Sequence, residues 1–179
     1  LRKATGRWRG ALTLHRQSLR DEIVERFDPV TFLATAENAS ARSRRQGVEV
    51  EAAFHPSPLL ALSAHYAFLD ASEPAGRELR RPRHSGALVA DGTSGRWTYG
   101  LSFSWSGARL DRDFDLFPSR LVRLDPALSG NGRIAYRVSK GLELFGRVSN
   151  ILDQGREEVV GYRREGRTVH AGIRARPGR

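Results

Sequence analysis

Trp97-Thr98-Tyr99-Gly100-Leu101-Ser102-Phe103-Ser104-Trp105 is the stretch of this sequence that decides the fold. Large apolar residues occupy every odd position of the stretch, and small or polar residues occupy every even position. This period of two is typical of a β-strand with one apolar and one polar face. A tryptophan stands at each end of the apolar face, and eight residue steps separate the two tryptophans by about 26 Å along the strand. The stretch therefore predicts a long strand whose odd-numbered side chains contact lipid or a hydrophobic core.

The same distance suits a strand that crosses a membrane. A tilt of about 40° reduces it to a vertical separation of about 20 Å, which fits the aromatic girdles that flank an apolar band about 25 Å tall. The alternation recurs over residues 48–54, 60–68, 134–138, 142–148 and 169–175, and we find no segment with a convincing helical period. We predict an all-β protein of about eight strands, over residues 6–27, 32–54, 59–71, 80–91, 96–110, 121–138, 142–162 and 167–176.

The segments between these strands alternate in length. Short turns are expected at 55–58, 91–95 and 139–141, and longer polar loops at 72–78 and 111–120. This asymmetry is typical of an antiparallel up-and-down transmembrane β-barrel, in which the short turns are periplasmic. Several strands exceed the roughly 9–11 residues that cross a bilayer, so we expect them to project as a rim. Long projecting strands favour a large ligand-gating barrel.

Composition excludes several other classes of protein. No apolar run approaches the roughly 20 residues of a membrane helix, which excludes a helical membrane protein. Cysteine is absent, which excludes disulfide frameworks and thiolate metal sites. The net charge of +10 raises nucleic-acid binding, but the arginines are spread from Arg2 to Arg179 without a basic helix, and we interpret them as solvated or lumenal charges. The chain has no Met and no signal-peptide pattern, so we expect it to begin within a longer protein.

Three segments carry a resemblance to a known family. They are residues 43–51 (Ser-Arg-Arg-Gln-Gly-Val-Glu-Val-Glu), 141–153 (Gly-Leu-Glu-Leu-Phe-Gly-Arg-Val-Ser-Asn-Ile-Leu-Asp) and 166–176 (Gly-Arg-Thr-Val-His-Ala-Gly-Ile-Arg-Ala-Arg). They resemble the "G-V-E" strand, the penultimate strand and the closing strand of TonB-dependent outer-membrane receptors. The resemblance implies that residues 1–179 are the C-terminal portion of such a receptor's β-barrel, about eight consecutive strands of a 22-strand type, without the plug domain. It also implies the bacterial outer membrane as the location.

Within this family the sequence is most similar to the cobalamin transporters. The similarity lies in residues 78–83 (Glu-Leu-Arg-Arg-Pro-Arg) and 107–114 (Gly-Ala-Arg-Leu-Asp-Arg-Asp-Phe). It implies that Arg80 and Phe114 are extracellular ligand contacts. Phe114 replaces the expected tyrosine, so only stacking or apolar contact is predicted there.

The implied function is import of a scarce ligand too large for porins, cobalamin first and a ferric siderophore next. The implied partners are the TonB complex, acting through a plug domain missing from this sequence, and the barrel-assembly machinery. The sequence departs from the family at two further places: Arg156 replaces a tyrosine, and Pro177-Gly178-Arg179 replaces the terminal aromatic, which resembles the signal read by the barrel-assembly machinery. The second departure predicts a truncated, frameshifted or poorly assembling product.

The other candidate sites, for metals, catalysis or nucleotides, lack the residue spacing that they require. Asp111, Asp113 and Asp115 open like a calcium loop, but Leu116 and Val122 stand where glycine and a bidentate glutamate are needed, so no metal site is predicted. The five histidines lack ligand spacing, and no nucleophile elbow, phosphate loop or dinucleotide fingerprint is present. We therefore predict neither catalysis nor a cofactor. Residues 130–132 (Gly-Asn-Gly) are expected to form a strand irregularity or turn.

Two alternatives stay open from the sequence. A self-contained eight-stranded outer-membrane barrel with a structural or adhesive role requires that the first and last strands pair. A soluble basic β-sandwich or nucleic-acid binder requires solubility without detergent and salt-dependent DNA affinity. The apolar face from Trp97 to Trp105 counts against the second alternative, because soluble proteins rarely expose such a patch.

Overall fold

A computed structural model describes residues 1–176 of the chain except residues 29, 40 and 75, and every regular element in it is a β-strand. The strands are β1 (Arg2–Thr5), β2 (Trp8–Leu19), β3 (Ile23–Phe27), β4 (Ala34–Asn38), β5 (Ser43–Ser57), β6 (Leu60–Glu73), β7 (Gly76–Arg77), β8 (His84–Ser94), β9 (Trp97–Ser106), β10 (Arg109–Asp113), β11 (Arg120–Leu124), β12 (Ala127–Ser139), β13 (Leu142–Ser149), β14 (Glu157–Val159), β15 (Tyr162–Arg163) and β16 (Thr168–Ala175). The predicted all-β fold is confirmed.

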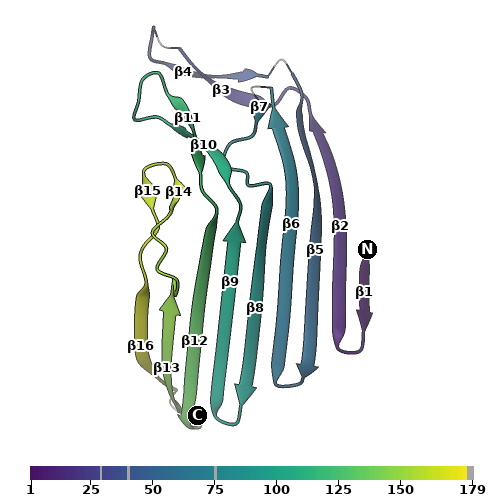
Figure 1. The fold of residues 1–179 in the computed structure, drawn as a ribbon, viewed down its shortest axis with the longest axis vertical. Coiled ribbons are helices and arrows are strands. Elements are labelled where there is room, and N and C mark those ends of the chain that lie inside the picture. The colour runs from purple at the N-terminus through teal and green to yellow at the C-terminus, as the bar shows by residue number, and fades with distance from the viewer. Residues whose placement is uncertain (29, 40, 75, 177–179) are drawn as a thin grey trace.

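Most of these strands form one curved antiparallel sheet. Its order is β1-β2-β5-β6-β8-β9-β12-β13-β16, with β7 paired to β6, and the strands follow one another up and down (Figure 1). Eight of them are at least eight residues long, namely β2, β5, β6, β8, β9, β12, β13 and β16, which confirms the predicted number of about eight. One end of the sheet carries tight turns, here called the turn end. The other end, the loop end, carries the separate hairpins β3–β4, β10–β11 and β14–β15 (Figure 1).

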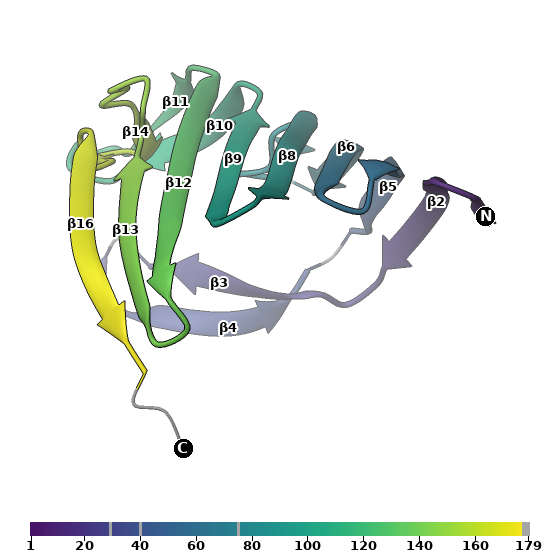
Figure 2. The same cartoon turned by 90° about the horizontal axis from the view of Figure 1, so that it is seen from below.

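Several predicted strands were too long. Residues 6–27 divide into β2 and β3, which belong to different sheets, and β3–β4 folds across the concave side of the curved sheet (Figure 2). The break falls at Asp21, whose φ of 53° leaves the extended region. The predicted strand 142–162 likewise ends at Ser149, because Asn150 has a φ of 52°. Asp and Asn tolerate this left-handed conformation better than most residues, and it ends the strand locally.

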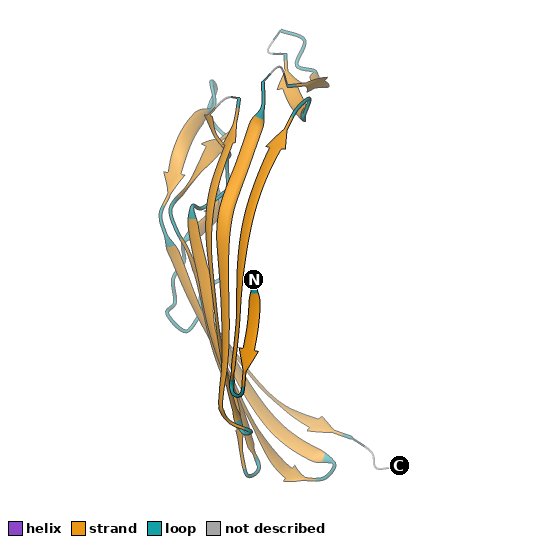
Figure 3. Ribbon diagram, turned by 90° about the vertical axis from the view of Figure 1, so that its right-hand side faces the viewer, coloured by secondary structure: helices purple, strands orange, loops and turns teal. Residues whose placement is uncertain are grey.

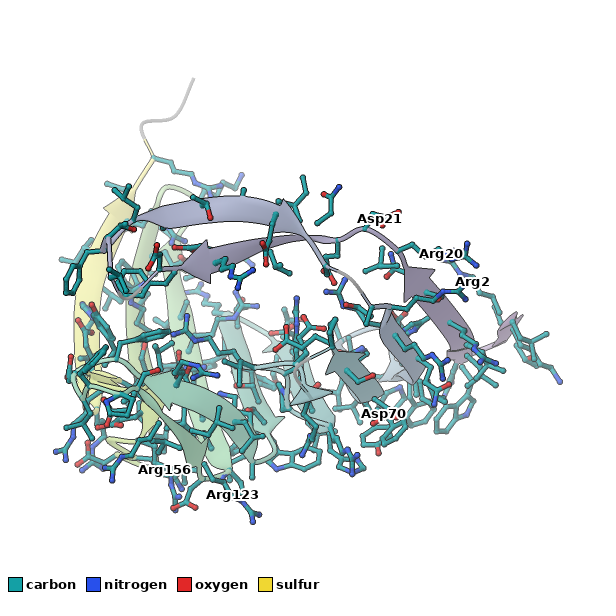
Figure 4. The ribbon with its side chains drawn as sticks, turned by 90° about the horizontal axis from the view of Figure 1, so that it is seen from above. Arg2, Arg20, Asp21, Asp70, Arg123 and Arg156 are labelled. Carbon is teal, nitrogen blue, oxygen red and sulfur yellow. The ribbon has the colours of Figure 1, made fainter. Side chains whose placement is uncertain are left out.

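The two faces of the sheet differ as the alternation predicts. Figure 3 shows the curvature of the long strands in profile. In the register, Trp97 lies opposite Tyr136, with ring centroids 4.7 Å apart, and Trp8 stacks on Phe54 at 4.0 Å. Asp70 belongs to the same face by strand parity, and Figure 4 shows it on the convex side, away from β3–β4. The apolar face is therefore convex, and the concave face carries the polar positions.

Two local predictions about turns and irregularities were wrong. Residues 130–132 lie within β12 and pair in regular register with β9, and the irregularity in β12 falls between Arg137 and Ser139 instead. A Cβ on Gly130 would lie 2.8 Å from the ring of Phe103, so this glycine makes room for an aromatic ring on the neighbouring strand. The turn expected at 91–95 is also shorter, because β8 continues to Ser94 and Gly95 supplies the positive φ of 59°.

The sheet is open along both edges. Among the described residues β16 pairs only with β13 and β1 only with β2, so the pairing of first and last strands required by a self-contained eight-stranded barrel is not present, and that prediction is wrong. The substitution predicted to affect assembly, Pro177-Gly178-Arg179, lies outside the described residues. No helix in the described part of the chain is long and apolar enough to cross a membrane.

Candidate functional site

The two predicted ligand contacts lie at the loop end of the sheet. Arg80 belongs to the segment between β7 and β8, where it has a φ of 59°. Phe114 directly follows β10, and 71% of its surface is exposed. The structure joins the two positions through the β10–β11 hairpin: Arg80 contacts the strand β10, and Phe114 begins the loop at the hairpin's tip.

Asp111 on β10 is the residue that fixes Arg80. Its carboxylate is fully buried and accepts a hydrogen bond of 2.7 Å from Arg80 Nε. The backbone N–H of Val160 donates to its other oxygen at 3.0 Å, and that of Arg112 donates at 2.8 Å. The backbone adds a further link, since Arg80 N donates to Leu110 O at 2.7 Å. One carboxylate thus connects the 78–83 segment, the β10–β11 hairpin and the β14–β15 hairpin.

Arg109 provides a second connection to the β14–β15 hairpin. This residue is only 8% exposed, and its Nη2 donates to the carbonyl oxygens of Glu158 at 2.5 Å and Glu157 at 3.5 Å. Its Nη1 donates to Ser106 Oγ at 3.1 Å. A guanidinium that spans a strand end and a neighbouring hairpin restricts the relative movement of both.

A separate ionic network connects the 78–83 segment with β5. Arg45 Nε lies 2.7 Å from Glu78 Oε2, and Arg45 Nη2 lies 3.1 Å from Glu22 Oε1. Glu78 also accepts from Arg81 Nε at 2.9 Å, and Glu22 accepts from the hydroxyl of Ser43. Glu22 precedes β3, so the network reaches the hairpin that crosses the concave side.

The electrostatics at these carboxylates follow from burial and hydrogen bonding. Burial by itself would raise the pKa of Asp111, but the bonds from the Val160 N–H, Arg80 and the Arg112 N–H outweigh it and hold the pKa below its ordinary value. Burial would likewise raise the pKa of Glu78, and its bonds to Arg45 and Arg81 lower it instead. Both groups are therefore charged over the physiological range.

The contacts described above connect loops at one end of the sheet. The part of the chain that the structure describes contains no group of three or more His, Cys, Asp or Glu side chains placed to hold a metal ion. Of the aspartates with calcium-loop spacing, Asp111 pairs with Arg80, and Asp113 lies 3.7 Å from Arg120. Both aspartates thus form ion pairs, one between the β10–β11 hairpin and the 78–83 segment and one within that hairpin.

The sequence predicts Arg80 as a ligand contact but gives no role to the residues that hold it in the structure. Metal binding is the only individual role that the sequence suggests for Asp111, and it suggests none for Arg109, Glu78 or Arg45. The alternation of aspartates at 111, 113 and 115 was the available signal, since it places Asp111 and Asp113 on one face of a strand. Nothing local in the sequence indicates that the partner of Asp111 is Arg80, 31 residues away.

Comparison with known proteins identifies the class. The chain resembles a pyoverdine outer-membrane receptor of Pseudomonas aeruginosa solved with pyoverdine bound, at a TM-score of 0.78 and 14% identity, over 96% of this chain and 27% of that chain. It also resembles the ferric-catecholate import receptor Fiu of E. coli K12, at 0.72 and 17% over 94% and 25%. The copper transporter OprC matches at 0.75 and 16% over 97% and 30%.

The curved sheet and its loop end, whose segments are connected through Asp111 and Arg109, define a section of the wall of an outer-membrane β-barrel, with its convex face toward lipid. The sequence matches the TonB-dependent receptor-like β-barrel family over residues 1–151. The chain belongs to this family. The predicted outer-membrane location is confirmed, and the prediction that the chain is no enzyme agrees with relatives that are receptors and transporters. The chain spans about a quarter of the length of the solved receptors that it matches.

Proposed function

We propose that the chain is the C-terminal portion of the barrel of an outer-membrane TonB-dependent transporter that imports a large, scarce ligand. A ferric siderophore is the first candidate, because the relatives include receptors for pyoverdine and for ferric catecholates. Cobalamin, implied by the resemblance of residues 78–83 and 107–114, is the second. The TonB complex, acting through a plug domain elsewhere in the protein, and the barrel-assembly machinery are the proposed partners.

The observation that carries this proposal is the set of contacts that holds the segments of the loop end together. Three segments that are far apart in sequence, around Arg80, Asp111 and Val160, are held together by one buried carboxylate at the end of the sheet opposite the tight turns. In a barrel of this family that end faces outward, because short turns are periplasmic. Fixed outer loops are suited to holding a ligand in one orientation, since preorganisation lowers the entropy lost on binding.

Arg80 and Phe114 are the proposed ligand contacts. The side chain of Arg80 is 51% exposed, and Asp111 occupies only its Nε, so other N–H donors of the guanidinium remain for a ligand's oxygen atoms. Phe114 adds an exposed aromatic ring for stacking or apolar contact. The pair combines a fixed cation with an apolar surface, which suits an oxygen-rich chelate or a corrinoid side chain.

Uptake by the intact protein tests the proposal. In a host without other receptors, expression of the protein that carries this chain should restore growth on ferric pyoverdine or a ferric catecholate, and the rescue should require TonB. Rescue by cobalamin alone would select the second candidate. Growth on none of these, with the protein folded in the outer membrane, would contradict the proposal.

A further inference from the structure

A basic cleft lies on the convex side of the wall where the sheet meets its loop end. Its volume is about 470 Å³, and five of its lining residues carry basic side chains: Arg77, Arg83, His84, Arg109 and Arg123. The remaining lining residues are glycine, alanine, leucine and proline, so none of the described residues that line the cleft carries a carboxylate. We call this set of five residues the basic cleft.

Strand register and Figure 4 place the basic cleft on the outside of the barrel wall. His84 lies opposite Phe68 on the apolar face, and the Tyr66 hydroxyl lies 2.8 Å from His84 Nδ1. Arg83 Nη2 lies 3.2 Å from Asp70 Oδ1. In Figure 4, Asp70 and Arg123 are both on the side of the sheet away from the β3–β4 hairpin. The cleft therefore opens toward the membrane side.

The depth of the cleft is that of lipid headgroups. Gly107, which lines it, follows Trp105 by two residues, or about 7 Å along the chain. Trp105, Tyr66 and Phe68 are the aromatic residues of the long strands nearest the loop end on this face, and such aromatics mark the boundary between hydrocarbon and headgroups. A side chain just beyond them meets the polar part of the outer leaflet.

The charges in the cleft are incompletely neutralised. Arg109 is 8% exposed, yet its guanidinium donates only to a hydroxyl and to carbonyl oxygens in the described part of the chain, so its positive charge has no carboxylate partner there. Over the same residues, no carboxylate lies within ion-pair distance of Arg77 or Arg123. Two acids that adjoin the cleft are already paired: Asp70 with Arg83, and Asp125 with Arg156 at 3.5 Å. A buried cation without a counter-charge is unfavourable, and an anion in the cleft removes that cost.

We propose that the basic cleft binds the phosphate group of a lipid in the outer leaflet. Arginines hold phosphate with paired, charge-assisted hydrogen bonds. The lipid's acyl chains would lie along the apolar face below, next to Trp105 and Tyr66. The proposal rests on the outer-membrane barrel fold alone, so it stands or falls separately from the identity of any imported ligand.

Native mass spectrometry of the intact protein in a neutral maltoside detergent tests this site. Phosphatidic acid is titrated against diacylglycerol with the same acyl chains, which differs only in lacking the phosphate. Phosphatidic acid should bind more tightly, and the double variant Arg77→Gln/Arg123→Gln should weaken its binding roughly 30-fold, as expected for two arginines at an anionic surface. Arg123→Gln alone should weaken it about fivefold.

Arg156→Gln is the matched control. Arg156 is an exposed arginine on the same side of the molecule (Figure 4), but it is not part of the basic cleft and already has a carboxylate partner. Its variant should bind phosphatidic acid within about twofold of the wild type. Equal loss in the control, no loss in the single and double variants, or equal binding of diacylglycerol would overturn the proposal. Displacement of the lipid by inorganic phosphate at a matching concentration would do so too, because the site would then serve a free anion.

Discussion

Arg133 on β12 reaches across β9 to Asp91 on β8, with 2.8 Å between Nη2 and Oδ1. Gly100 is the residue of β9 that lies between them in the register, and a Cβ added there would lie 2.5 Å from both Arg133 Nε and Asp91 Oδ1. The ion pair therefore crosses a whole strand on the concave face because that strand has no side chain at this point.

We expect Gly100→Ala to separate this ion pair. The added methyl group displaces two partly exposed side chains, and an exposed pair of this kind is worth at most about 1 kcal/mol. The measurement is the denaturant midpoint of the purified protein, with Asp91→Asn in a double-mutant cycle. Gly146→Ala is the control, because its Cβ would meet only ordinary contacts at 3.8 Å. This account would be contradicted if Gly100→Ala were as stable as the control and the double-mutant cycle gave no interaction energy between Gly100→Ala and Asp91→Asn.

The alternation of residues was sufficient to predict the long strands and their two faces, because an apolar phase on one side forces a period of two. It was not sufficient for the strand ends. The polar and apolar pattern continues past Asp21 and Asn150, while the backbone leaves the extended region at both residues. The loop end was less predictable still, because the contact between Arg80 and Asp111 joins residues that are distant in sequence. Such pairing depends on how hairpins fold back over the sheet.

Asp111→Asn should loosen the loop end without unfolding the sheet. The amide keeps the shape of the side chain but presents an NH₂ group to donors, and loss of charge-assisted bonds at a buried carboxylate costs about 2–3 kcal/mol. We expect faster hydrogen exchange in residues 78–83 and 157–163, and little change in β5, β6 or β9. Asp115→Asn is the control, since Asp115 is exposed in the β10–β11 loop. Equal exchange in both variants would show that Asp111 does not hold these hairpins.

Acid should release the same contacts. Because the pKa of Asp111 and that of Glu78 are lowered in the folded state, their contribution is complete above the unfolded-state value near pH 4 and is lost as the pH falls from about 4 through the lowered pKa. We expect spin labels on the β10–β11 and β14–β15 hairpins to gain mobility in that range. The Asp111→Asn protein should already be mobile at pH 7 and change less on acidification. Release that begins near pH 6 would point to histidine instead.

Phe114→Ala should weaken ligand binding more than it affects folding. The ring is exposed in the free protein, so its removal leaves no cavity, while the loss of an apolar contact of this size corresponds to about a tenfold or larger fall in affinity. Binding of the ligand identified by the uptake assay is measured by titration calorimetry on the intact protein. Leu116→Ala removes an apolar side chain from the same loop and serves as the control. Phe114→Tyr should retain affinity, because the ring stays and a hydroxyl is added; an affinity that is unchanged in Phe114→Ala, or that falls equally in Leu116→Ala, would exclude Phe114 as a specific contact.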